Sequence, residues 1–130
     1  PSNDFSCMIS QRDFDDLFLP GIIEECRHME ANIYHLDGPK ALRHLDSLLE
    51  VKEIDAIQWM QGSGNGPASD WLAVYGKCQK AGKALQIELS IGELPLLIEN
   101  LRPEGLNLGI QDVVDHEQAR WVLDRVTRWR

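Results

Sequence analysis

The sequence predicts a protein of the α/β class, and two observations lead to this prediction. Short apolar segments with alternating polarity recur along the chain, and each is followed by a longer segment with helical periodicity. The connections between them are short, which favours parallel strands joined by right-handed helical crossovers. Hydrophobic residues make up 43% of the 130 residues, enough for one core, so we expect a single domain over residues 1–130.

The expected elements follow one another in a simple order. Residues 5–9 form the end of a strand or a strand-to-helix loop, and Ser10 is a suitable cap for a helix that continues to about Met29. Pro20-Gly21 is expected to kink that helix. The strands then predicted are 31–37, 54–60, 84–89 and 106–108, and the helices between and after them are 39–51, 68–81, 92–101 and 115–129.

Each predicted strand has one apolar face and one face with polar side chains near its carboxyl end. These polar side chains are His35, Asp37, Gln58, Gln86, Glu88 and Asn107. An ordinary buried parallel strand would be apolar on both faces. Polar groups at the carboxyl ends of strands are typical of a (β/α)8 barrel with a functional mouth. Since a closed barrel takes about 250 residues, we predict a half barrel of four to five parallel strands alternating with helices.

The strongest candidate site is the pair His35 and Asp37. An imidazole and a carboxylate two residues apart project together from a strand end, beside the turn at Gly38. Such a pair is either a site or part of a buried hydrogen-bond network. Gln58, Gln86 and Asn107 have the same two interpretations, as ligand-binding groups or as hydrogen-bonded core residues.

Other polar residues receive simpler interpretations. The glycine-rich loop after the second strand is expected to line the mouth and bind substrate through Gly62, Gly64 and Asn65. His44, next to charged residues on a helix, is expected to be solvated. His28 and His116 are expected at helix ends, as caps or surface groups.

Composition excludes several classes of partner. The net charge of −8 and the absence of a basic stripe argue against nucleic acid and against an anionic membrane surface. No apolar run approaches the roughly 18 residues that span a bilayer, and no signal-peptide pattern appears. No glycine-rich phosphate-binding motif follows any strand. Cys7, Cys26 and Cys78 form no CxxC motif, so we expect reduced thiols and a cytoplasmic protein.

Several segments together resemble a known family. They are His35-Leu36-Asp37-Gly38, the leucines Leu42, Leu45, Leu48 and Leu49, the strand Ile54–Trp59, the segment Ser10–Pro20, and the later Ala81-Gly82-Lys83 and Gly105–Gly109. This pattern is similar to the C-terminal half of the uroporphyrinogen decarboxylase superfamily, which includes corrinoid-dependent methyltransferases. The resemblance covers nearly the whole chain and implies a (β/α)8 barrel of which these residues are the C-terminal half.

The resemblance implies one of two chemistries. Methyltransferase members bind zinc through a His-x-Cys-Gly strand end and a later Cys; here His35 matches, Asp37 stands in the Cys position, and the last strand has no Cys. His35 and Asp37 would then hold the metal, with Glu88 as a further ligand, and the loss of soft ligands favours harder ions. Decarboxylase members bind a tetrapyrrole without metal and carry a His after the last strand's glycine, where this chain has Ile110.

Two functional hypotheses follow. In the first, the chain is part of an enzyme that carries out methyl transfer or tetrapyrrole-related chemistry, with a corrinoid on a partner protein. His35 would be the base or ligand, Asp37 would orient it or share the ion, and Glu88 and Gln58 would support them. In the second, the chain is a non-catalytic half barrel whose open strand edges pair. Its partner would be a second copy, in a homodimer, or the N-terminal half of a barrel.

Overall fold

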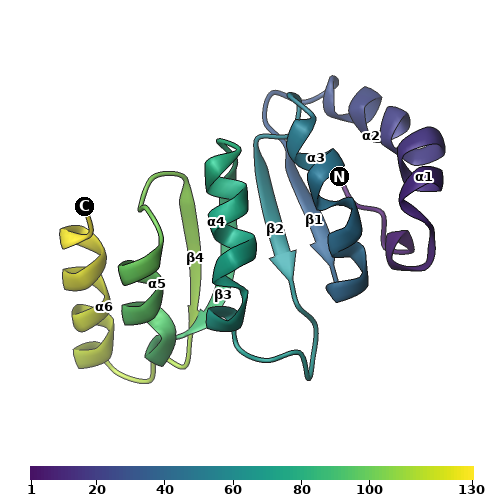
Figure 1. Ribbon diagram of the computed structural model, residues 1–130. Coiled ribbons are helices and arrows are strands. Elements are labelled where there is room, and N and C mark those ends of the chain that lie inside the picture. The colour runs from purple at the N-terminus through teal and green to yellow at the C-terminus, as the bar shows by residue number, and fades with distance from the viewer.

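The computed structural model describes all 130 residues, and its centre is one sheet of four parallel strands (Figure 1). The strands are β1 (Ile33–Asp37), β2 (Ala56–Met60), β3 (Ala84–Ser90) and β4 (Leu106–Gln111). They lie in the sheet in chain order, β1-β2-β3-β4, and every neighbouring pair is parallel. The predicted α/β class with four parallel strands alternating with helices is confirmed. The last strand is three residues longer than expected, and the second begins at Ala56 rather than at Ile54.

Helices connect the strands and flank both ends of the sheet. They are α1 (Gln11–Asp13), α2 (Leu19–Cys26), α3 (Leu45–Glu50), α4 (Leu72–Lys80), α5 (Leu94–Asn100) and α6 (His116–Arg128). Single 3-10 segments lead into α3, α4 and α5, namely Pro39–His44, Ala68–Trp71 and Ile91–Glu93, and another spans Ser6–Met8. Figure 1 shows α1 and α2 at one end of the molecule and α6 at the other.

The first helical region contains Pro20, and a π-helical turn just before it accommodates this proline. Ser10 caps this region as predicted, because its Oγ accepts a hydrogen bond of 3.1 Å from the Asp13 amide. Pro20 has no N–H and its ring crowds the carbonyl one turn earlier. The residues just before it, Phe14–Phe18, adopt a π-helical turn, and Pro20 then stands at the start of α2.

The core lies between the sheet and the helices that connect its strands. Alternation directs one face of each strand into it, and the residues on that face of β1, β2 and β3 are buried: Tyr34, Leu36, Ile57, Trp59, Leu85, Ile87 and Leu89. The equivalent residues of β4 are only half-buried. The core therefore thins toward β4, the last strand of the sheet.

The amino ends of the strands are held by polar side chains that bond to backbone carbonyls. Asn32 donates from Nδ2 to the carbonyls of Cys26 and Glu53, at 3.0 Å each. Lys83 donates from Nζ to the carbonyls of Val51 (2.6 Å) and Ile54 (2.5 Å). The side-chain donors of Asn32 and Lys83 are thus bonded to carbonyls of neighbouring loops. At its amino end, therefore, the polar side chains of the sheet stabilise the fold.

His44 does not lie in solvent, as its charged sequence neighbours suggested. It is fully buried in the 3-10 segment that precedes α3, stacked on the ring of Phe14 with centroids 4.2 Å apart. Its Nε2 donates to the Ser6 carbonyl at 2.9 Å. His44 is buried because it falls on the side of this helical turn that faces Phe14. Its charged neighbours in the sequence do not determine its burial. His28 and His116 are exposed, as expected.

All three cysteines are free thiols, Cys7 half-buried and Cys26 and Cys78 buried. Burial raises the pKa of the Cys78 thiol to about 12, so this thiol stays protonated and unreactive at neutral pH. None of the helices has the length and the apolar character needed to cross a bilayer.

Glu93 joins two strand-to-helix connections at the carboxyl end of the sheet. Its Oε2 accepts from the amide (2.8 Å) and the hydroxyl (3.0 Å) of Ser90 in a capping box, and its Oε1 accepts from the amide of Ser69 at 2.8 Å. Burial alone would raise the pKa of this carboxyl group. The hydrogen bonds from Ser69 and Ser90 outweigh that effect, and the pKa lies below the ordinary 4.5.

We predict that Glu93→Gln lowers the free energy of unfolding by about 1–2 kcal/mol near neutral pH, since it removes charge-assisted hydrogen bonds. A carboxyl group whose pKa is lower in the folded state stabilises the fold above the unfolded pKa. That contribution disappears as the pH falls through the folded pKa. Urea unfolding of both proteins from neutral to acidic pH should therefore show the difference shrinking below about pH 4.5. Glu99→Gln, on the exposed side of α5, is the control. A difference that stays constant with pH would contradict this role.

Candidate functional site

The face of the sheet opposite the core carries a row of polar side chains in register. His35 pairs with Gln58, Gln58 with Gln86, and Gln86 with Asn107, so one level of the sheet holds a polar residue on all four strands. Every residue on this face except Ala56 is half-buried or exposed. Neighbouring strands lie about 4.8 Å apart, so the row extends for roughly 14 Å. We call His35, Gln58, Gln86 and Asn107 the polar row. It crosses β1 and β2 at their third residues but β4 at its second residue, so Asn107 does not lie near the carboxyl end of its strand, as the sequence suggested, because β4 continues to Gln111.

His35 is held by Gln58, not by Asp37 as the sequence suggested. Its Nδ1 lies 2.7 Å from Oε1 of Gln58. An amide oxygen only accepts, so Nδ1 carries the proton and donates. In the neutral imidazole, Nε2 is then left with its lone pair, and no protein group bonds to it. The polar row therefore contains a half-buried histidine in a fixed tautomer with one free acceptor nitrogen.

Glu88 lies one level closer to the carboxyl end, on β3. Its Oε2 accepts a hydrogen bond of 2.7 Å from Nε2 of Gln111 on β4. Its carboxylate occupies the space that a Cβ on the neighbouring Gly109 would fill. The glycine at position 109 thus makes room for the carboxylate, a role that the sequence alone did not reveal.

The remaining predicted residues lie around this carboxyl end. Asp37 ends β1 and is exposed, on the same face as His35. Gly62 and Gly64 have positive φ, which turns the exposed loop sharply after β2. Asn65 closes that loop on itself, because its Nδ2 donates to the Gln61 carbonyl at 2.7 Å. Its amide is therefore already engaged within the loop.

The donors on this face do not complete a metal site. Asp37 and His35 share one strand, whereas Glu88 lies two strands away, and no group of three or more His, Cys, Asp or Glu side chains converges anywhere in the chain. Protein zinc sites use at least three protein ligands. The residues present therefore do not by themselves fit the zinc centre that the family resemblance implies.

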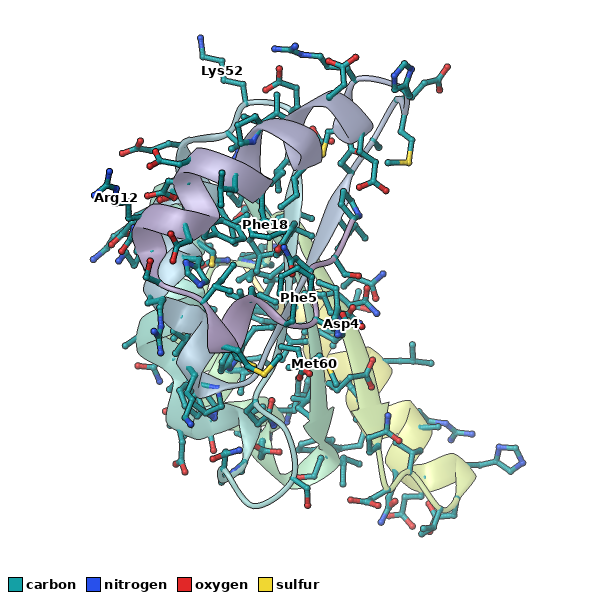
Figure 2. The ribbon with its side chains drawn as sticks, turned by 90° about the vertical axis from the view of Figure 1, so that its right-hand side faces the viewer. Asp4, Phe5, Arg12, Phe18, Lys52 and Met60 are labelled. Carbon is teal, nitrogen blue, oxygen red and sulfur yellow. The ribbon has the colours of Figure 1, made fainter.

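Acidic side chains stand beside the polar row, although charges of both signs lie at each end of the sheet, with Lys40 after β1 and Glu53, Asp55 and Glu104 before β2 and β4. Asp37, Glu88 and Asp112 lie at or just beyond the carboxyl ends of their strands, and Asp112 adopts a positive φ of 64° in the turn after β4. Lys52 projects at the opposite end, far from Met60 at the carboxyl end of β2 (Figure 2). A field of this sign favours neutral or cationic ligands near the polar row and repels polyanions.

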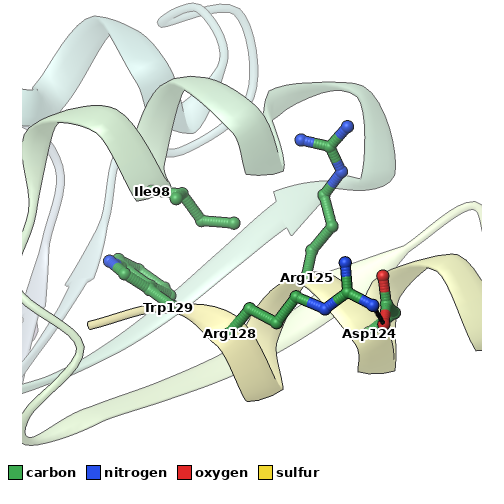
Figure 3. Close-up of a pocket in the computed structure, with 5 residues that line it drawn as sticks. All are labelled: Ile98, Asp124, Arg125, Arg128 and Trp129. Atoms are coloured by element: carbon green, nitrogen blue, oxygen red, sulfur yellow. Dashed lines mark ion pairs between the residues drawn. The ribbon is translucent and has the colours of Figure 1, made fainter.

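A separate hollow of about 290 Å³ lies between α5 and α6 (Figure 3). Ile98 and Trp129 form its apolar part, and Arg128 is paired with Asp124 at 2.7 Å. Trp129 also donates from Nε1 to the carbonyl of Leu101, near the amino end of β4. None of the residues predicted from the sequence lines this hollow, and it lies away from the polar row.

Comparisons with known proteins give no relative: no family model, no curated protein and no solved structure matches this chain.

The structure adds two residues to those that the sequence singled out as the site. Gln86 completes the polar row, and Gln111 binds Glu88. Alternation in β3 already placed Gln86 on the polar face, so the sequence contained this signal. Gln111 was missed because β4 extends beyond Leu108, where the expected strand ended.

We predict that Gln58→Ala removes the preference of His35 for the tautomer protonated at Nδ1. Without an acceptor at Nδ1, the imidazole should populate the Nε2–H form as well, which long-range proton–nitrogen NMR spectra of the ring distinguish directly. Gln86→Ala, in the same row but with no hydrogen bond to the ring, is the matched control and should leave the tautomer unchanged. An unaltered Nδ1–H signal in Gln58→Ala would contradict the assignment.

We further predict that Gly109→Ala displaces the Glu88 carboxylate and costs about 1 kcal/mol, because the bond to Gln111 is lost. In a Glu88→Ala background the same substitution should cost nothing or stabilise the strand, since alanine suits a strand better than glycine. Urea unfolding of the four proteins measures both effects. If Gly109→Ala lowers the free energy of unfolding by the same amount in both backgrounds, the added methyl group does not clash with Glu88.

Proposed function

We propose that the chain is half of a (β/α)8-type barrel related to the uroporphyrinogen decarboxylase superfamily, with the polar row as part of a reaction site at its mouth. The observation that supports this most is the hydrogen bond of 2.7 Å between His35 and Gln58. It leaves a free imidazole nitrogen on the uncovered face of a parallel sheet, among polar side chains from all four strands. Active sites of barrel enzymes lie at the carboxyl ends of their strands.

In this proposal His35 is the group that reacts with or binds the substrate. Nε2 would accept a proton from the substrate, with Nδ1–H held by Gln58 throughout. Gln86 and Asn107 would orient polar groups of the substrate through their amide donors and acceptors. Asp37, with Gly62 and Gly64 in the neighbouring loop, would line the entrance. Glu88 is a less direct participant, because its carboxylate is already bound by Gln111.

Of the two chemistries in the superfamily, methyl transfer is the one we favour. The carboxylates at the carboxyl end of the sheet repel a substrate with many carboxylates, such as the tetrapyrrole of a decarboxylase, and accept a neutral or cationic one. A corrinoid on a partner protein would carry the methyl group when bound. We assign zinc no step, because His35 and Asp37 are two donors and no third joins them.

The setting proposed for this activity is the cytoplasm. Three free thiols support a reducing compartment. The net charge of −8 disfavours nucleic acid as a partner.

We predict that His35→Gln lowers methyl transfer by about 10²–10⁴-fold, the usual contribution of a general base. The assay follows the corrinoid absorption spectrum while methylcobalamin is demethylated by a small thiol. His116→Gln, an exposed histidine outside the polar row, should retain full activity. Metal analysis of the same samples tests the zinc expectation separately. If the wild type and His35→Gln turn over at the same rate, His35 is not the base and the proposal is wrong; if the wild type shows no turnover, the half barrel is non-catalytic in this assay.

A further inference from the structure

Exposed apolar side chains gather at the two ends of the molecule. Eleven large hydrophobic residues are exposed, and ten of them lie before β1, at its first residue, or after β4. At the amino-terminal end they are Phe5, Met8, Leu17, Met29 and Ile33, and at the carboxy-terminal end they are Val113, Val114, Trp121, Leu123 and Val126. Leu96 on α5 is the exception. The segments between β1 and β4 bury nearly all their large apolar residues, whereas the segments before β1 and after β4 leave several exposed.

The sheet is also unfinished at its carboxy-terminal side. β4 pairs only with β3, and the amide of Leu85 on β3 donates to the carbonyl of Gly105 at 2.8 Å. In a parallel ladder this register directs the amides of Leu108 and Ile110 away from β3, toward the open edge. The outer edge of β1 is partly used, because the amide of His35 donates to the carbonyl of Pro1 and Ser2 forms a parallel bridge with His35.

The helical segments at the two ends carry opposite net charge, although Asp112 and Asp115 in the turn between β4 and α6 bring residues 112–130 as a whole to zero. The helical segment 11–26, through α1 and α2, has five acidic residues against one arginine, a net charge of −4. The segment 116–130, which contains α6, has four arginines against two acidic residues, a net charge of +2. Contact between unlike ends is attractive, whereas contact between two copies of the same end is repulsive.

From these three observations we propose that two copies of the chain associate head to tail. The β4 edge of each copy would receive the amino-terminal edge of the other, and α6 would pack beside α1 and α2 of the second copy. Leu123 and Val126, exposed at 67% and 39%, would be covered at this junction. Two such junctions related by a twofold axis would close a ring of eight parallel strands, once Pro1 and Ser2 leave the edge of β1 where they bond to His35.

This inference rests on the proposed barrel geometry but not on its chemistry. In the closed ring the polar rows of both copies face one interior, so each site gains its missing walls from the second copy. The alternative, in which two β4 edges meet each other, would bring two positively charged α6 helices together. Opposite net charge on the helical segments 11–26 and 116–130 therefore favours the head-to-tail arrangement.

The first test is the mass in solution by light scattering on a gel-filtration peak. We expect the wild type at about twice the chain mass of 14.8 kDa, and Leu123→Glu and Val126→Glu at the mass of one chain. Leu96→Glu places the same charge on an apolar residue exposed to 43% but away from both ends, and should remain a dimer. Circular dichroism checks that each variant is folded. A monomeric wild type, or dimers that persist in both α6 variants, would overturn the proposal.

A charge exchange tests the head-to-tail pairing itself. Arg120→Glu/Arg125→Glu reverses the charge of α6, and Glu24→Lys/Glu25→Lys adds positive charge to α2. Each double variant alone should be mostly monomeric, and their mixture should recover mixed dimers that contain one copy of each. Mixed dimers in the mixture support contact between unlike ends. If no mixed dimers form, this contact is refuted. His35→Gln should leave the mass unchanged, so failure of the dimer and failure of the catalytic proposal are separate results.

Discussion

The in-register parallel pairing of β1 to β4 is the constraint on which the rest of the structure depends. Because side chains alternate across a strand, one register decides both faces of the sheet at once. It sends Tyr34, Trp59 and Ile87 into the core and brings His35, Gln58, Gln86 and Asn107 to a single level on the other face. A slip of one residue in any strand would bury an amide or the imidazole and expose an apolar side chain.

The two ends of the sheet differ in how far their polar groups are already engaged in hydrogen bonds within the chain. At the amino ends, Asn32 and Lys83 bond to backbone carbonyls of neighbouring loops. At the carboxyl ends, Asp37 is exposed and glycines turn the loop after β2, while His35, in the middle of β1, keeps a free nitrogen. Glu93 is the structural exception at this end, since it joins the starts of two helical segments. This difference is the one expected of parallel α/β sheets with a site at the carboxyl ends.

Local patterns in the sequence were sufficient for the strands and for the direction of their polar side chains. Alternation around Leu85, Ile87 and Leu89 predicted the polar face of β3, and the structure confirms it. Alternation says nothing about partners across strands, however, so the bond between His35 and Gln58 could not be predicted. The burial of His44 was also missed, because it depends on where Phe14 packs, thirty residues away in the sequence.

The two unfinished ends explain features that have no role within one copy. The core thins toward β4, apolar side chains of α6 are exposed, and the amides of Leu108 and Ile110 face no strand. In a barrel each of these would be covered by the next unit. All three features result from a sheet of four strands whose last strand, β4, has an unpaired edge.

The central claim is that β4 has one edge paired within the chain and one edge that only a further strand completes. Amide hydrogen exchange, followed by NMR residue by residue in β4, tests it most directly. In the Leu123→Glu monomer we predict alternation, with slow exchange at Asn107 and Gly109 and fast exchange at Leu108 and Ile110. In the wild-type dimer all four amides should exchange slowly. Fast exchange at Leu108 and Ile110 in both proteins, or no alternation in the monomer, would contradict the account.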